Sequence, residues 1–221
     1  MDIRTIILDF DGTIVESVGI KDKAFRVLYE EYPEKLDEIM EYHLDHNATV
    51  RYHKFRHIAE NILKEDYTEE KEEELSEKFA ELVFKNIVKC PYVEGGIDFL
   101  EYFYRKVPLY LVSASPEDEL DRILDERELK KYFKDVYAIP WVKKDAVKEI
   151  LLEEGINAEE AVFIGDTMED YESASSSGVK FIARNSNKPF NGINIDLFKD
   201  MVEIREYLVK NMTKEQGGEI G

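Results

Sequence analysis

The spacing of hydrophobic positions changes near the start of the chain. The β-branched apolar run at residues 3–8 ends before Gly12 and is typical of a strand that is buried on both faces. From residue 21 to about residue 89, apolar residues recur at helical spacing instead. The acidic run at residues 69–74 indicates the solvated start of one of these helices. We therefore expect a first strand that is followed by a long all-helical segment.

After Pro91 the pattern alternates between short apolar runs and helical stretches. The runs that we expect to form strands are residues 107–114, 136–139, 161–164 and 179–183. Such alternation is typical of a parallel α/β sheet. We also expect a helix at residues 143–154 that stops at Gly155, a last helix at residues 195–210 that covers the sheet, and a frayed tail at residues 213–221.

These elements predict one α/β core that is interrupted by an insertion. We assign residues 1–16 and 91–221 to the core and residues 17–90 to an inserted helical domain. Loops at the carboxyl ends of parallel strands form the binding crevice of such sheets. Because the insertion begins just after the first strand, we expect it to act as a lid over that crevice.

Composition and charge exclude several classes of partner. The chain has 221 residues, of which 49 are acidic and 30 are basic, and its formal charge is −19. This charge repels nucleic acid and anionic membrane surfaces, so neither is an expected partner. No apolar run approaches the ~20 residues that cross a bilayer, and the single cysteine, Cys90, cannot form an internal disulfide. We expect a cytoplasmic protein in which an anionic substrate requires local positive charge.

Two aspartates follow the first strand directly. Asp9 and Asp11 are two positions apart, so an extended backbone sends both side chains to the same side, and Gly12 lets the chain turn away. Converging carboxylates are costly unless a cation lies between them or one of them is protonated. Asp and Gly are also ordinary turn residues, so spacing alone leaves a simple polar turn open.

Polar residues also stand near the ends of two later strands. Ser113 lies near the end of one apolar run, and Ser115 is the better candidate for capping the next helix because Pro116 follows it. Asp166 and Asp170 are four positions apart behind another run, where such acids can simply begin a helix.

The string that begins at Asp9, Asp-Phe-Asp-Gly-Thr-Ile-Val-Glu-Ser, resembles the first motif of the haloacid dehalogenase superfamily of phosphohydrolases. Ser113 matches the second motif, and the Gly-Asp-x-x-x-Asp spacing that ends at Asp170 matches the fourth. The third motif is a lysine, for which the sequence register favours Lys143 and leaves Lys144 as an alternative. The resemblance covers the whole core and implies a Rossmann-like parallel sheet sandwiched by helices, with an all-α cap, as in phosphoglycolate phosphatase-like members.

The resemblance also implies catalytic roles. Asp9 is expected to attack phosphorus and form an aspartyl-phosphate, while Asp11 protonates the leaving alcohol and then deprotonates the hydrolytic water. Ser113, the backbone amide of Ala114 and Lys143 are expected to bind the phosphoryl oxygens. The expected substrate is therefore a small phosphate ester, similar to phosphoglycolate or a sugar phosphate.

A metal site is implied as well. Mg²⁺ prefers carboxylate oxygens and retained waters. The resemblance implies that Asp9, Asp166 and the backbone carbonyl of Asp11 hold Mg²⁺, with Asp170 supporting the site from a second shell.

Three other functions can be compared with that of a phosphatase. Family members that cleave carbon–halogen bonds lack an acid at the position of Asp11, so dehalogenation is not expected. A phosphomutase keeps all four motifs and remains an alternative. A non-catalytic module phosphorylated on aspartate, similar to a receiver domain, is disfavoured because such domains have no helical insertion of this kind.

The predicted lid carries a local cluster of basic residues. All four histidines lie in it, at His43, His46, His53 and His57. A zinc site at His53 and His57 is disfavoured because no cysteine is near. We expect Arg51 or Lys54 to bind a second anionic or hydroxyl-rich part of the substrate, because they supply positive charge in an acidic chain.

Overall fold

The computed structural model describes residues 1–46 and 49–212, so the tail expected at residues 213–221 lies outside the described residues. By its internal contacts the chain divides into two compact units. The core unit contains Met1–Glu16 and the chain from Cys90 onward, and the helical unit is Ser17–Lys89. No described helix is long and apolar enough to cross a membrane.

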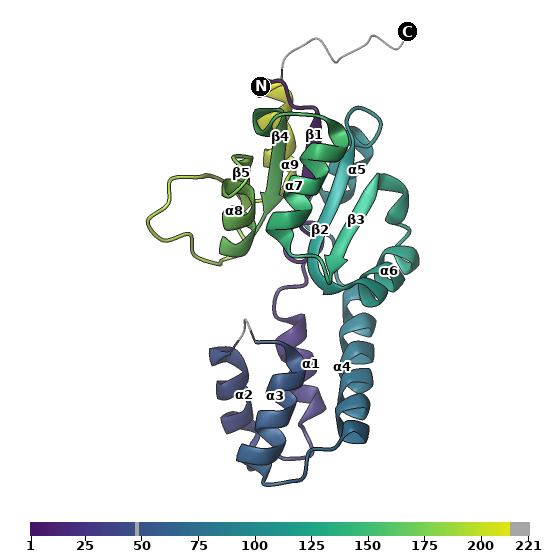
Figure 1. Cartoon of the computed structure of the whole chain (residues 1–221), viewed down its shortest axis with the longest axis vertical. Helices are drawn as coiled ribbons and strands as arrows, with labels where there is room; N and C mark the ends of the chain where they lie inside the picture. The colour runs from purple at the N-terminus through teal and green to yellow at the C-terminus, as the bar shows by residue number, and fades with distance from the viewer. Residues whose placement is uncertain (47–48, 213–221) are drawn as a thin grey trace. The chain divides into compact units, whose positions relative to one another are not determined.

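The core unit is built on a sheet of six parallel strands in the order β3-β2-β1-β4-β5-β6 (Figure 1). The strands are β1 (Thr5–Leu8), β2 (Leu109–Pro116), β3 (Asp135–Ile139), β4 (Ala161–Gly165), β5 (Lys180–Arg184) and β6 (Asp196–Phe198). The predicted parallel α/β architecture is confirmed. The strand order reverses direction at β1, and in doubly wound sheets ligands bind beside such a reversal, at the carboxyl ends of the strands.

Helices cover both faces of this sheet (Figure 1). On one face, α7 (Lys143–Glu154) and α8 (Met168–Ser175) pack together, and on the other α5 (Gly96–Phe103) packs against α9 (Met201–Asn211). The remaining elements of the core unit are α6 (Glu117–Glu126) and the short 3-10 turns η2 (Lys130–Tyr132) and η3 (Ala158–Glu160).

The position of α7 is fixed by its apolar side. Ala146, Val147 and Ile150 are completely buried in a cluster that also contains residues of β1, β2 and β4. The helix ends where the sequence predicts, because Gly155 adopts a left-handed conformation with φ of 61°. This packing holds the first residue of α7, Lys143, in a buried position at the carboxyl edge of the sheet.

The prediction of one helix at residues 195–210 is wrong at its start. Residues Asp196–Phe198 form the edge strand β6, and the helix begins only at Met201. Asp200 explains the break, because its side chain accepts hydrogen bonds from the backbone amides of Val202 and Glu203 and caps the helix. A strand of three residues is too short to show a period of its own.

The described part of the helical unit, residues 17–46 and 49–89, contains helices joined by turns and loops, and no strand. These are α1 (Ile20–Leu28), α2 (Leu36–Asp45), α3 (Arg51–His57), a π-helical turn η1 (Ile58–Leu63) and α4 (Glu69–Lys89). Its core is aromatic: the ring of Phe25 lies 3.9 Å from that of His43 and 5.6 Å from those of Phe55 and Phe79, measured between centroids. The acidic run predicted to begin a helix does begin α4.

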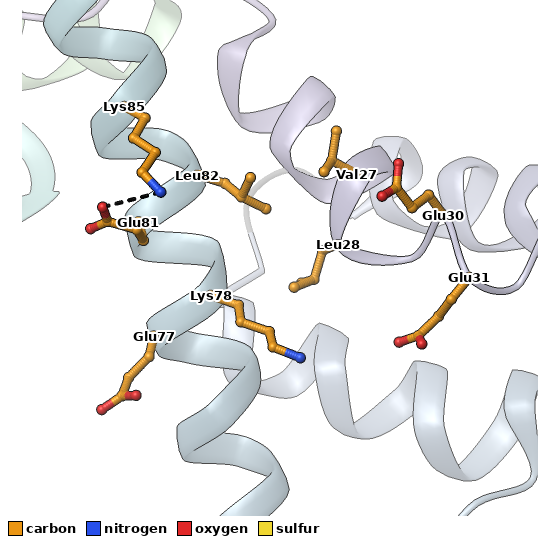
Figure 2. Close-up of a pocket in the computed structure, with 9 residues that line it drawn as sticks. All are labelled: Val27, Leu28, Glu30, Glu31, Glu77, Lys78, Glu81, Leu82 and Lys85. Atoms are coloured by element: carbon orange, nitrogen blue, oxygen red, sulfur yellow. Dashed lines mark ion pairs between the residues drawn. The ribbon is translucent and has the colours of Figure 1, made fainter.

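A groove of about 580 Å³ lies between α1 and α4 on this unit (Figure 2). Val27, Leu28 and Leu82 supply its apolar side chains, and glutamates and lysines surround them. Lys85 pairs with Glu81 at 3.5 Å across one turn of α4. None of the residues that line the groove belongs to the predicted catalytic or metal site.

Candidate active site

Two acids of the site, Asp9 and Asp166, follow adjacent parallel strands. Leu8 of β1 pairs with Ile164 of β4, and the backbone amide of Asp9 donates to the carbonyl of Ile164 at 2.9 Å. Asp9 follows β1 directly and Asp166 follows β4 directly. Because these strands are neighbours in register, both side chains start from the same edge of the sheet. Asp9 is 3% exposed and Asp166 is 0% exposed.

Lys143 joins two of the predicted site residues. Its ammonium lies 2.7 Å from Oδ1 of Asp9 and 2.6 Å from Oδ1 of Asp170. The neighbouring Lys144 is exposed. The structure therefore brings Lys143, and not Lys144, to the acidic cluster.

Both carboxylate oxygens of Asp170 accept hydrogen bonds from the protein. Oδ1 accepts from Lys143, while Oδ2 accepts from the backbone amides of Asp166 and Thr167 at 3.2 and 3.0 Å and from the Thr167 hydroxyl at 2.6 Å. Thr167 in turn caps α8 by accepting from the Asp170 amide. Gly165 makes room for this arrangement, since a Cβ atom there would lie 2.6 Å from Cγ of Asp170. These contacts favour a supporting role for Asp170 over direct metal ligation.

Asp11 lies in a tight turn that begins just after β1. The carbonyl of Phe10 accepts hydrogen bonds from three following amides, and the Gly12 amide donates to the carbonyl of Val15 at 2.8 Å. Arg184, at the end of β5, donates to the Gly12 carbonyl at 3.2 Å and forms an ion pair with Glu16. The turn is therefore fixed from β5, which lies two strands away from β1 in the sheet, and the Asp11 side chain is half-buried.

Ser113 and Ala114 lie on β2, which pairs with β1 on the side opposite β4. Ser113 is buried and its hydroxyl accepts from the Ser115 amide at 3.2 Å, while Ala114 is exposed. The prediction that Ser115 caps the next helix is wrong, because Pro116 occupies the cap position and makes no side-chain cap. Ser115 instead belongs to β2, which runs further than its apolar residues suggest.

Burial controls the electrostatics of this cluster. Burial raises the pKa of Asp9 well above its usual range, the charge of Asp170 raises it further, and Lys143 opposes both. Burial alone would lower the pKa of Lys143, but the charges of Asp9 and Asp170 prevail and raise it. Burial also raises the pKa of Asp166, against the lowering effect of Lys188. The carboxylates thus lack full charge compensation, which favours the binding of a cation.

The donor set fits a hard divalent cation. Asp9, Asp166 and Asp170 each offer a carboxylate oxygen, and these oxygens lie within 4.8 Å of one another. Oδ1 of Asp166 is buried and accepts no well-formed hydrogen bond, although the Ser186 hydroxyl is close enough to lower the pKa of this carboxyl group. A buried carboxylate oxygen of this kind is stabilised when a cation binds it. Within residues 1–46 and 49–212 this is the only cluster of three or more potential metal ligands.

Sequence reasoning missed Lys188. Its ammonium lies 2.7 Å from Oδ2 of Asp166, although it belongs to the irregular segment between β5 and β6. No motif or periodicity marks this lysine. Only the folding of that segment toward the sheet edge brings it to the site.

The predicted lid residues, Arg51 and Lys54, lie in the helical unit. Arg51 is half-buried, and its guanidinium lies 5.3 Å from the ring centroid of Tyr52 and 5.8 Å from that of Phe79. Lys54 is 4% exposed, and its ammonium contacts His43 at Nδ1 and at the carbonyl oxygen, at 3.4 and 3.3 Å. Burial lowers the pKa of Lys54, and the charge of Asp22 opposes this.

The four histidines do not form one group. His43 bonds through Nε2 to Asp22 at 2.9 Å, and His46 bonds through Nδ1 to the carbonyl of Tyr42 at 2.8 Å. His57 stacks on the ring of Tyr42 with centroids 4.0 Å apart. The ring of His46 also lies 4.1 Å from that of Tyr42, so His46 and His57 share one aromatic contact while His43 has a separate one.

This chain is similar to several known proteins. A family model described as haloacid dehalogenase-like hydrolase matches residues 6–184. Phosphoglycolate phosphatase 1 of Pseudomonas aeruginosa is 26% identical over 189 residues, covering 81% of this chain and 68% of that protein. The HAD hydrolase YfnB of Bacillus subtilis, solved with bound magnesium, has a TM-score of 0.72 at 18% identity and covers 94% of this chain and 99% of its own. A Thermotoga maritima protein assigned as a β-phosphoglucomutase has a TM-score of 0.73 at 17% identity, with 95% and 100% covered.

The two solved structures share the fold of this chain at low identity. The matched segment extends from β1 to the end of β5 and contains Asp9, Asp11, Ser113, Lys143 and Asp166. The resemblance inferred from the motifs is therefore confirmed. The chain belongs to the haloacid dehalogenase-like hydrolase family and is an enzyme of the phosphatase type.

Proposed function

We propose that this enzyme is an Mg²⁺-dependent phosphatase that hydrolyses a small phosphorylated metabolite through an aspartyl-phosphate. The observation that carries the proposal is the contact of Lys143 with both Asp9 and Asp170, beside the buried Asp166. A fixed cation beside a buried carboxylate suits the transfer of a charged phosphoryl group, which needs alignment and charge neutralisation.

The chain's own residues supply the proposed steps. An oxygen of Asp9 attacks phosphorus while the bond from phosphorus to the leaving oxygen breaks, and Asp11 gives that oxygen a proton. Asp11 then takes a proton from a water that attacks the same phosphorus, which releases inorganic phosphate and restores Asp9. Lys143 keeps Asp9 oriented and offsets charge on the phosphoryl oxygens, and Ser113 with the Ala114 amide binds those oxygens.

The proposed metal is Mg²⁺. Asp9, Asp166 and the backbone carbonyl of Asp11 would hold it, and Asp170 would orient the site through the donors described above. When bound, Mg²⁺ supplies charge neutralisation for the carboxylates and for the phosphoryl oxygens. The buried Oδ1 of Asp166, which accepts no well-formed hydrogen bond, supports this assignment.

The proposed substrate is a small phosphate ester such as phosphoglycolate or a sugar phosphate. Similarity to phosphoglycolate phosphatase 1 of Pseudomonas aeruginosa supports this class. The formal charge of −19 is unfavourable for binding nucleic acid or anionic membranes, so we propose neither as a partner. We also propose that the enzyme acts in the cytoplasm. The helical unit is proposed as the cap, with Arg51 contributing to substrate choice, because Lys54 is buried against His43.

A screen of phosphorylated metabolites tests this function. Each compound is incubated with the enzyme and Mg²⁺, and free phosphate and rearranged sugar phosphates are both measured. Asp9→Asn is the matched control, since the amide has the same shape but is a poor nucleophile. Release of inorganic phosphate by the wild type but not by Asp9→Asn supports hydrolysis. Conversion to an isomeric sugar phosphate would instead assign the enzyme as a mutase, an alternative that the similarity to the Thermotoga maritima structure supports. Equal release of inorganic phosphate by the wild type and by Asp9→Asn would refute both the phosphatase and the mutase, because both assign the attack on phosphorus to Asp9.

A further inference from the structure

The ammonium of Lys188 forms an ion pair with Asp166, a carboxylate that the proposed metal also needs. This ammonium lies 2.7 Å from Oδ2 of Asp166, while Oδ1 of the same carboxylate accepts no well-formed hydrogen bond. Asp166 is completely buried, whereas the Lys188 side chain is 41% exposed. The pair therefore joins a fixed buried acid to a cation that can withdraw into solvent.

The backbone around Lys188 places the ammonium there. On one side, Asn187 adopts a left-handed conformation with φ of 67°, and its amide donates to the Asn185 side chain at 3.1 Å. On the other side, the ring of Phe190 packs against Phe181 of β5, with centroids 5.8 Å apart. The segment is anchored before and after Lys188, so the ion pair follows from a fixed backbone position.

We propose that Lys188 is a tethered cation that competes with Mg²⁺ for Asp166 and so sets the Mg²⁺ concentration at which the enzyme becomes active. Without metal, Lys188 neutralises Asp166. A divalent cation on Asp166 repels the ammonium and must displace it, at the expense of the ion pair. This inference rests on the proposed function for the identity of the metal, but it concerns a residue that the family motifs do not include.

The competing interpretation is that Lys188 holds Asp166 in the orientation that Mg²⁺ requires. The two interpretations predict opposite effects of removing the charge. Competition predicts tighter Mg²⁺ binding without the ammonium, and orientation predicts weaker binding.

Calorimetric titration of the metal-free full chain with MgCl₂ distinguishes them. Lys188→Met removes the charge and keeps the length, and Lys188→Gln removes the charge but retains a hydrogen-bond donor should the methionine variant fold poorly. Both are expected to bind Mg²⁺ about tenfold more tightly than the wild type, because a like charge a few ångströms from the metal is lost. Lys188→Arg keeps the charge and is expected to bind within about twofold of the wild type.

Lys148→Met is the matched control. It makes the same change of side chain and net charge on the outer face of α7, where Lys148 is 54% exposed and lies 3.7 Å from Asp145. Its Mg²⁺ affinity is expected to equal that of the wild type. Melting temperatures give a second readout: metal-free Lys188→Met should melt lower than the wild type, because Asp166 loses its partner, and should gain more from saturating Mg²⁺.

Unchanged or weaker Mg²⁺ binding in both Lys188→Met and Lys188→Gln would overturn the inference and leave the proposed phosphatase intact. An equal gain in Lys148→Met would also overturn it, because the effect would then come from net charge alone. Absence of Mg²⁺ binding in every protein, including the wild type, would instead remove the metal from the proposed function and the inference with it.

Discussion

The ammonium of Lys143 lies 2.7 Å from Oδ1 of Asp9, and both side chains are almost completely buried. Taking two charges out of water is costly, and the cost is offset only when geometry and further hydrogen bonds are good. Here the same ammonium also contacts Asp170 at 2.6 Å. One lysine therefore compensates two buried carboxylates, which makes it the electrostatic centre of the site.

Replacing this lysine should both inactivate and destabilise the enzyme. Lys143→Met leaves Asp9 and Asp170 buried without their cation, a change that typically costs about 3–5 kcal/mol. The loss should shrink as the pH falls, because protonation of a carboxyl group removes the unpaired charge. Urea unfolding at neutral and mildly acidic pH measures this, with Lys144→Met as the adjacent exposed control. Equal stability of both variants at neutral pH would contradict the account.

Asp170 is expected to act through its neighbours. Asp170→Asn keeps the shape but replaces one acceptor by a donor, so the contacts with Lys143 and Thr167 cannot all survive. Supporting residues of this kind typically contribute about 10- to 100-fold to metal affinity or activity. We expect losses of that size in kcat/KM and in Mg²⁺ affinity. A variant with unchanged metal affinity would show that Asp170 does not support the metal.

Gly165 tests the same contact from the other side. In Gly165→Ala the new methyl group would lie 2.6 Å from Cγ and 2.7 Å from Oδ2 of Asp170, so the carboxylate must move. Overpacking of this kind typically costs about 1–3 kcal/mol, and displacement of Asp170 should lower kcat more than it raises KM. Steady-state kinetics and thermal melting check both effects. Wild-type kcat in this variant would mean that the position of Asp170 is not critical.

Protons are expected to compete with Mg²⁺. Burial raises the folded-state pKa of both Asp9 and Asp166, with Asp170 adding to the effect on Asp9. A carboxyl group whose pKa is higher in the folded than in the unfolded protein lowers the free energy of unfolding of the metal-free protein when the pH is above the folded-state pKa. This destabilisation decreases as the pH falls from the folded-state pKa to the unfolded-state pKa. Mg²⁺ requires the ionised carboxylates, so its apparent affinity and its effect on melting temperature should decrease as the pH falls from about 8 to about 5. If Mg²⁺ raised the melting temperature equally at every pH, that result would argue against Asp9 and Asp166 as metal ligands.

The positions of the acidic cluster could be predicted because two of its acids stand at the ends of local apolar runs. Asp9 and Asp166 each follow a short β-branched or aromatic strand, and parallel strands bring their carboxyl ends to one edge. The choice of Lys143 over Lys144 was also available in the sequence. Lys143 shares a helical stripe with Ala146, Val147 and Ile150, all of which are buried, and a lysine on that stripe points toward the sheet.

Other features depend on tertiary contacts that no local pattern encodes. Lys188 reaches Asp166 because an irregular segment is anchored by an asparagine turn and by Phe190. The edge strand β6 exists because it pairs with β5, and its three residues fit a helix equally well in sequence. The sequence around Lys54 predicts a lysine on the surface, but in the structure Lys54 is buried against His43 in the aromatic core of the helical unit.

Identification of the phosphorylated residue tests the central claim most directly. The enzyme is mixed with a substrate from the screen and Mg²⁺, quenched with acid during turnover and reduced with borohydride, which converts an aspartyl-phosphate into homoserine. Peptide mass spectrometry then locates the homoserine, and Asp9→Asn serves as the unlabelled control. The account predicts homoserine at position 9 in the wild type only. Label at Asp11, Asp166 or Asp170, or steady turnover with no homoserine in any peptide, would contradict it.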